Sequence, residues 1–172
     1  MMLSMKLKSE PRKGRANGVG AVILTVTTIA LGWSSLALAQ NEDKVKAGLE
    51  LWKGSGCSDC HGAFANGEKE RDESPTGADL RTARLDAAAL KKVISCGRVG
   101  AEMPAFIEGS CSAPACSGQR AGEYPAPRTL TSDEIDLVVA YLQARIVGHG
   151  RITKVECLAY YDNQEDMCVD YQ

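Results

Sequence analysis

Apolar residues recur at helical spacing in two long stretches of the chain. The first stretch contains Val45, Gly48, Leu49 and Trp52, at i, i+3, i+4 and i+7, and Asn41 is its expected N-cap. The second stretch carries one apolar stripe made of Ile135, Val138, Val139, Leu142 and Ile146. Both patterns predict amphipathic helices. We expect the two helices to cross at Gly48, because a glycine lets another backbone approach closely.

Polar residues and glycines mark where the helices begin and end. Thr131, followed by Glu134, forms a capping box for the second helix, and Gly148 is its stop signal. A shorter helix is predicted to start at Asp86 as N-cap and to run to Ser95, with Gly97 ending it. The segments between these helices are predicted to be loops.

The first 39 residues differ in composition from the rest. Residues 1–15 carry five Lys and Arg against one Glu, an apolar run from about Val19 to Trp33 follows, and small residues end at Ala37-Leu38-Ala39. This order is typical of a secretory signal peptide. An uncleaved anchor is the alternative, but the run is shorter than the roughly 20 residues of a membrane span. We expect cleavage after Ala39, a periplasmic protein, and no stable membrane insertion after cleavage.

The remaining chain is acidic. The whole sequence has 20 Lys and Arg against 22 Asp and Glu, and residues 1–39 take away five of the former and one of the latter. Residues 40–172 are left with 15 against 21, a formal charge of −6. This charge disfavours nucleic acid and anionic membranes and favours a protein partner with a basic patch. Acidity that serves only solubility is the alternative.

The most specific chemical motif is Cys57-Ser58-Asp59-Cys60-His61. A C-x-x-C-H sequence is typical of covalent attachment of c-type haem. On a helical turn Cys57 and Cys60 share one face, so both sulfurs can bond the haem vinyl groups while His61 ligates the iron. A zinc site or a thioredoxin-type pair is the alternative, but neither a second C-x-x-C nor a strand–helix–strand frame accompanies the motif.

Met103 is the predicted sixth ligand of the iron. Pro104 pushes the residue before it into extended geometry and prevents a helix there, and a thioether suits low-spin iron. Beyond residue 39 the chain has two methionines, Met103 and Met167, and two histidines, His61 and His149. Because Met167 lies in the tail and His149 follows the last helix, Met103 is preferred. An open site or ligation by His149 is the alternative.

All seven cysteines follow residue 39, and five of them lie outside the haem motif. In an oxidising compartment we expect them to form disulfides. Cys157 and Cys168 are the only cysteines of the tail, residues 149–172, and nothing else holds that tail. We therefore predict that they pair.

Three cysteines, Cys96, Cys111 and Cys116, remain around the Met103 segment. A Cys96–Cys111 bond would brace the residue that is expected to ligate iron, and we predict this pairing, with Cys116 left free or available for an intermolecular bond. A Cys111–Cys116 bond is the alternative, because those two cysteines are closer in sequence.

Together these motifs resemble those of class I cytochromes c. The resemblance rests on the Gly48/Trp52 helix, the haem motif, the Met103-Pro104 loop and the final helix with Tyr141-Leu142, and it covers about residues 43–148. It implies an all-α fold wrapped around one covalently bound haem c, and electron transfer rather than catalysis. The chain would then consist of a signal peptide (1–39), a cytochrome c domain (40–148) and a disulfide-bearing tail (149–172) packed on that domain.

Two features depart from the family pattern. The Pro-Leu pair that packs on haem is Asp79-Leu80 here, and the cysteine-bearing loop and tail are additions. In the same stretch, Arg81 and Arg84 are interpreted as solvated, with pairing to the haem propionates as the alternative. The additions resemble those of small acidic cytochromes that accept electrons from periplasmic quinoprotein alcohol dehydrogenases.

This weaker resemblance implies such a dehydrogenase as electron donor and an oxidase or another cytochrome as acceptor. Two other functions stay open at this point. One is a haem subunit that the tail fixes to a dehydrogenase complex. The other is a haem sensor or enzyme with a labile sixth ligand.

Overall fold

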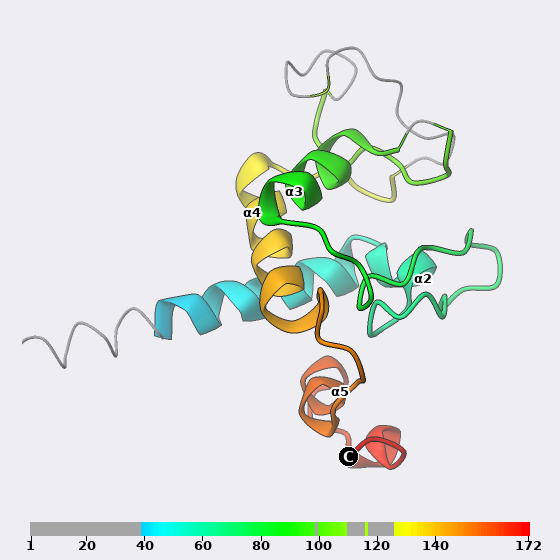
Figure 1. Cartoon of the computed structure of the whole chain (residues 1–172), viewed down its shortest axis with the longest axis vertical. Coiled ribbons are helices and arrows are strands. Elements are labelled where there is room, and N and C mark those ends of the chain that lie inside the picture. The colour runs from blue at the N-terminus through cyan, green and yellow to red at the C-terminus, as the bar shows by residue number, and fades with distance from the viewer. Residues whose placement is uncertain (1–38, 99, 110–115, 117–125) are drawn as a thin grey trace, which may run out of the picture. The chain divides into compact units, whose positions relative to one another are not determined.

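A computed structural model describes residues 39–98, 100–109, 116 and 126–172 (Figure 1). The chain divides into two units after Ala39, and the unit Gln40–Gln172 contains the elements discussed below. In these residues the regular elements are helices, and the extended pairing is a single parallel bridge between Ile107 and Leu130. The expected all-α class is therefore confirmed for the described part of the chain.

The predicted signal peptide lies almost wholly outside the described residues, and it stays a prediction. The boundary between the two units falls at the expected cleavage point. Within the described ranges, no helix combines the length and the apolar character that a membrane span requires.

The helices follow one another along the unit Gln40–Gln172. A helix covers residues 39–54, followed by α2 (Cys57–His61), α3 (Ala87–Cys96), α4 (Ser132–Tyr141), η2 (Leu142–Ile146), α5 (Lys154–Tyr160) and η3 (Glu165–Cys168). η2 is a π-helical turn that continues α4, and η3 is a short 3-10 helix. Figure 1 shows α3 next to α4, and the helix 39–54 leading into α2.

Side-chain caps start three of the helices. Asp86 accepts a hydrogen bond from the backbone of α3, and Thr131 with Glu134 forms a capping box at α4. Both caps confirm the sequence-based prediction. An equivalent box of Thr153 and Glu156 starts α5, a helix that we did not predict. The predicted N-cap at Asn41 is wrong, since the two residues before it are already helical.

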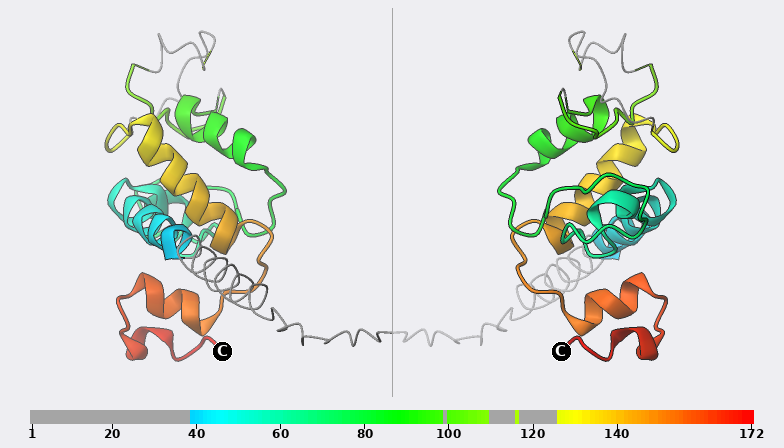
Figure 2. Two further views of the ribbon diagram at one scale, coloured as in Figure 1. Left: turned by 90° about the vertical axis from the view of Figure 1, so that its left-hand side faces the viewer. Right: turned by 90° about the vertical axis from the view of Figure 1, so that its right-hand side faces the viewer.

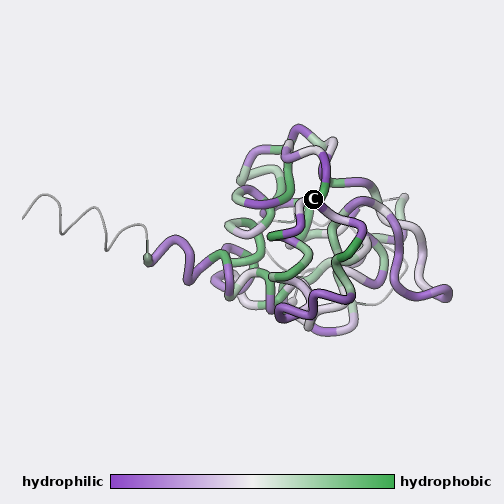
Figure 3. Tube along the Cα trace, turned by 90° about the horizontal axis from the view of Figure 1, so that it is seen from below, coloured by the Kyte–Doolittle hydropathy of each residue, from purple (hydrophilic) through white to green (hydrophobic). Residues whose placement is uncertain are grey.

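The helix 39–54 crosses α4 at Gly48, as predicted. A Cβ atom at Gly48 would lie 2.1 Å from the carbonyl oxygen of Leu137 and 2.7 Å from Cβ of Tyr141. Only a glycine permits this approach. The core gathers around the crossing, with the buried side chains of Val45, Leu49, Trp52, Ile135, Val138, Leu142 and Ile146. Figure 3 shows hydrophobic residues collecting where the helices meet, whereas the start of the helix 39–54 is hydrophilic.

The tail contacts the loop after α2 through aromatic side chains. The ring of Phe64 contacts those of Tyr160, Tyr161 and Tyr171, with centroids 5.6, 5.9 and 5.3 Å away. A disulfide between Cys157 and Cys168 joins α5 to η3, which confirms the predicted pairing. Figure 2 shows these two helices side by side in both views.

The second disulfide differs from the prediction. Cys96, the last residue of α3, bonds to Cys116, so the predicted Cys96–Cys111 bond and the alternative Cys111–Cys116 bond are both wrong. A disulfide needs Cα atoms within about 4.4–6.8 Å, and those of Cys96 and Cys116 are 5.2 Å apart. Both side chains are buried. Cys111 lies outside the described residues.

Candidate functional site

A cavity of about 730 Å³ opens between α2, the loop after it, α3 and the segment that carries Met103. This volume is within the roughly 300–1,000 Å³ of small-molecule sites. Most of its wall is apolar and comes from Trp52, Leu80, Leu85, Leu90, Val93, Ile94, Phe106, Val138 and Leu142. Cys57, Cys60, His61 and Met103 also line it. The structure therefore brings all four predicted site residues to one cavity.

The two cysteines of α2 are thiols, whereas the other cysteines among the described residues form disulfides. Burial raises the pKa of the Cys57 thiol to about 12, and the neighbouring Cys60 adds to this effect. Burial also raises the pKa of Cys60. A thioredoxin-type pair needs a lowered thiol pKa, so this environment disfavours that alternative.

His61 is oriented by a hydrogen bond to the backbone. Its Nδ1 atom lies 2.8 Å from the carbonyl oxygen of Ala78. Because a carbonyl can only accept, Nδ1 carries the proton and Nε2 keeps its lone pair. Burial lowers the pKa of His61, and the bond to Ala78 opposes this shift. The ring is therefore held in the neutral form that binds metals, with the tautomer that leaves Nε2 as the ligand atom.

The loop after α2 folds back against His61. The backbone N–H of Gly77 donates to the carbonyl oxygen of Cys60, 2.8 Å away. A Cβ atom at Gly77 would lie 2.6 Å from Nδ1 of His61. On another side, the ring of Trp52 packs against the imidazole, with centroids 5.9 Å apart. Packing thus restricts the ring that the hydrogen bond orients.

Trp52 also presents an unsatisfied polar atom. Its side chain is 2% exposed and lines the cavity. Among the described residues, its Nε1–H finds no hydrogen-bond acceptor. An unpaired buried donor costs about 1–3 kcal/mol. The cavity as a whole fits a covalently held haem. It offers two thiols, a neutral imidazole, a thioether and an apolar wall.

Met103 reaches the cavity from the segment that follows α3. Its carbonyl oxygen accepts a hydrogen bond from Arg98 and would be 2.7 Å from a Cβ atom at Gly97. The segment is therefore anchored at the end of the helix. The competing residues lie elsewhere, since Met167 is 48% exposed in η3 and His149 lines a different groove.

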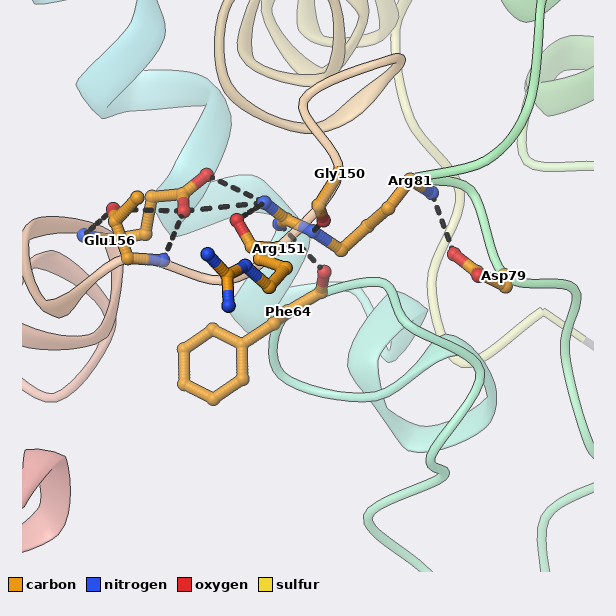
Figure 4. Close-up of polar contacts among 7 residues, drawn as sticks. Phe64, Asp79, Arg81, Gly150, Arg151 and Glu156 are labelled. Carbon is orange, nitrogen blue, oxygen red and sulfur yellow. Dashed lines mark hydrogen bonds and ion pairs between the residues drawn. The ribbon is translucent and has the colours of Figure 1, made fainter. Parts of the chain in front are cut away.

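The two arginines that we interpreted as solvated behave differently. Arg84 is exposed and lines the cavity, so it is available to a charged group there. Arg81 is 3% exposed, and the prediction for it is wrong. Its guanidinium group is surrounded by carbonyl oxygens and by the carboxylate of Glu156 (Figure 4). These partners come from the tail, about 70 positions further along the chain, and a local pattern carries no signal for them.

Comparison with known proteins assigns no family or function to the chain. No protein-family model matches the chain, and neither a curated protein nor a solved structure does. Within the described residues, no three His, Cys, Asp or Glu side chains gather where they could hold a metal ion. The functional conclusion therefore rests on the cavity and its residues.

Proposed function

We propose that the protein is a periplasmic electron carrier of the class I cytochrome c type. One haem c would be bound covalently through Cys57 and Cys60, with His61 and Met103 as axial ligands. The observation that carries the proposal is that these four side chains, from two separate segments, line one apolar cavity.

A bound haem would supply reversible one-electron chemistry, and the residues of the cavity would hold and shield it. The thiols of Cys57 and Cys60 provide the covalent bonds. The carbonyl of Ala78 holds the proton of His61 on Nδ1, so Nε2 would be the atom that binds the iron. With haem bound, the apolar wall would limit the access of water to it, and a thioether ligand would raise the reduction potential relative to a second histidine.

The partners would be other redox proteins. A periplasmic dehydrogenase, of the quinoprotein alcohol dehydrogenase kind, is proposed as donor, and an oxidase or another cytochrome as acceptor. The formal charge of −6 on residues 40–172 supports an encounter with a basic surface. Association with such a partner should slow as salt rises, because a screening length of about 10 Å at 0.1 M weakens long-range attraction.

The test of this function is haem attachment in protein made with a cytochrome c maturation system. Acid–organic extraction should leave the haem on the polypeptide. The double variant Cys57→Ala with Cys60→Ala should lose it. The matched control, Cys157→Ala with Cys168→Ala, removes two cysteines outside the cavity and should keep the haem. Release of haem from the unmodified protein would overturn the proposal.

A further inference from the structure

We propose that Arg81 is a positioning residue for the axial ligand His61, and that it couples this ligand to the C-terminal tail. The inference rests on the proposed function. Arg81 does not line the cavity, so it would act through the backbone that contacts His61 rather than by touching the haem.

The guanidinium group of Arg81 is almost fully satisfied inside the protein. Its Nε donates to the carbonyl oxygen of Gly150 at 2.5 Å, and Nη2 donates to that of Arg151 at 3.0 Å. Nη1 donates to the carbonyl oxygen of Phe64 at 3.3 Å. Figure 4 shows the side chain extending between these carbonyls. One cation therefore holds the start of the tail and the loop after α2 together.

Glu156 completes the cluster. Its two carboxylate oxygens lie 3.1 and 3.2 Å from Nη2 of Arg81, and its side chain is 15% exposed. The same carboxylate accepts the backbone N–H of Thr153 at 2.8 Å, as part of the capping box of α5. The first turn of α5 and the position of Arg81 consequently depend on one shared group.

The link from Arg81 to His61 is short. Ala78, whose carbonyl oxygen binds Nδ1 of His61, is three residues before Arg81. Between them, Leu80 donates its backbone N–H to the carbonyl oxygen of Ala65 at 2.8 Å, and the backbone N–H of Arg81 is bonded to Asp79. Because the guanidinium also binds Phe64, both ends of the loop that encloses His61 are held by Arg81.

This arrangement should influence the reduction potential with a definite sign. A hydrogen bond from Nδ1–H makes the imidazole a more basic ligand, which favours ferric iron. If the loop loosens, this bond weakens and the potential rises. Loss of the positive charge of Arg81 has the opposite Coulomb effect, because a nearby cation disfavours the ferric state. The direction of the change therefore separates positioning from simple electrostatics.

The experiment compares Arg81→Gln with the native haem protein. The expected results are a higher midpoint potential and faster hydrogen–deuterium exchange of His61 Nδ1–H, followed by NMR. The matched control is Arg145→Gln, which removes an exposed ion pair with Glu42 and should leave both measurements unchanged. A lower or unaltered potential, or an unaltered exchange rate, would overturn the inference.

Two further points make the test decisive. If Arg81→Gln does not fold, Arg81→Lys keeps the charge but lacks the planar fork, and the same two changes are expected in it. If native protein releases haem on extraction, the proposed function has failed. If a variant retains haem and behaves like the native protein in both measurements, only the role of Arg81 has failed.

Discussion

Gly77 lies directly against the ring of His61, where a Cβ atom would be 2.6 Å from Nδ1 and 2.8 Å from Cγ. The next residue, Ala78, accepts the hydrogen bond from the same ring. The imidazole is therefore enclosed by two consecutive backbone units. Glycine is required here for space, because its Cα must approach an aromatic ring.

Gly77→Ala should disturb His61 without a general loss of structure. The added methyl group overlaps the ring, so either the loop or the imidazole of His61 must move. We expect a lower haem content, or a smaller fraction of haem with a low-spin spectrum. Gly54→Ala is the control, since a Cβ atom there meets nothing within 4 Å. Equal haem content and equal spectra in the two variants would contradict this prediction.

Met103→Ala should remove the proposed sixth ligand of the iron. We expect the weak far-red band of sulfur-to-iron charge transfer to disappear from the ferric spectrum, and the ferrous protein to bind carbon monoxide. Met167→Ala, which alters the exposed methionine of η3, should retain the band and exclude carbon monoxide. Rapid carbon monoxide binding by the native protein at neutral pH would instead favour a sensor or enzyme.

Gly48→Ala should destabilise the contact between the helix 39–54 and α4. The new Cβ atom would lie 2.1 Å from a backbone oxygen that cannot rotate away. We expect the free energy of unfolding to fall by at least the ~1–3 kcal/mol that is typical of overpacking. Gly54→Ala, in the same helix, should leave it unchanged or raise it slightly. Chemical denaturation of both variants gives the comparison.

The capping box of α4 should make stability depend on pH. Hydrogen bonding to the backbone of Thr131, supported by Arg128, lowers the pKa of Glu134 below its ordinary 4.5. The folded protein thus favours the carboxylate, and its contribution is present above the ordinary pKa and lost as pH falls through the lowered one. The free energy of unfolding, measured with urea, should be higher for the native protein than for the Glu134→Gln variant at pH 7. This difference should vanish in acid. A difference independent of pH would refute this role, and Asp133→Asn controls for charge in the same turn.

The two disulfides should have separable roles. Replacing Cys96 and Cys116 by serine frees the segment that carries Met103, so carbon monoxide binding should increase. Replacing Cys157 and Cys168 should lower the free energy of unfolding by roughly 2–4 kcal/mol and leave the bond between Met103 and the iron intact. Both double variants are compared by carbon monoxide titration and denaturation. The prediction fails if the variant without Cys96 and Cys116 binds no more carbon monoxide than the native protein.

Features with local signals were predictable from the sequence. The caps at Asp86 and Thr131 involve residues three positions apart, and the approach at Gly48 follows from a glycine on an apolar face. Thr153 and Glu156 carry the same T-x-x-E signal as the capping box of α4, yet α5 is short and was missed. The π-helical turn η2 has no such signal, because its apolar stripe continues that of α4.

Prediction was poorer where partners are distant in sequence. Spacing brought Cys57, Cys60 and His61 together, and elimination selected Met103. A backbone carbonyl such as that of Ala78 has no signature in the side-chain sequence. Arg81 meets partners 69 to 75 positions away, and an isolated arginine in a polar loop is normally solvated. Likewise, separation in sequence did not indicate that Cys116 is the cysteine that bonds to Cys96 at the end of α3.

The partners of Arg81 also determine when this region can mature during synthesis. Cys57, Cys60 and His61 are made before Gly150, Arg151 and Glu156, which lie about 90 positions or more further along the chain. Until these arrive, the guanidinium lacks the acceptors that bury it, and the loop over His61 remains unfastened. A nascent chain that ends before residue 150 should therefore leave Cys57, Cys60 and His61 open to modifying enzymes, and synthesis of the chain through Glu156 should close that interval.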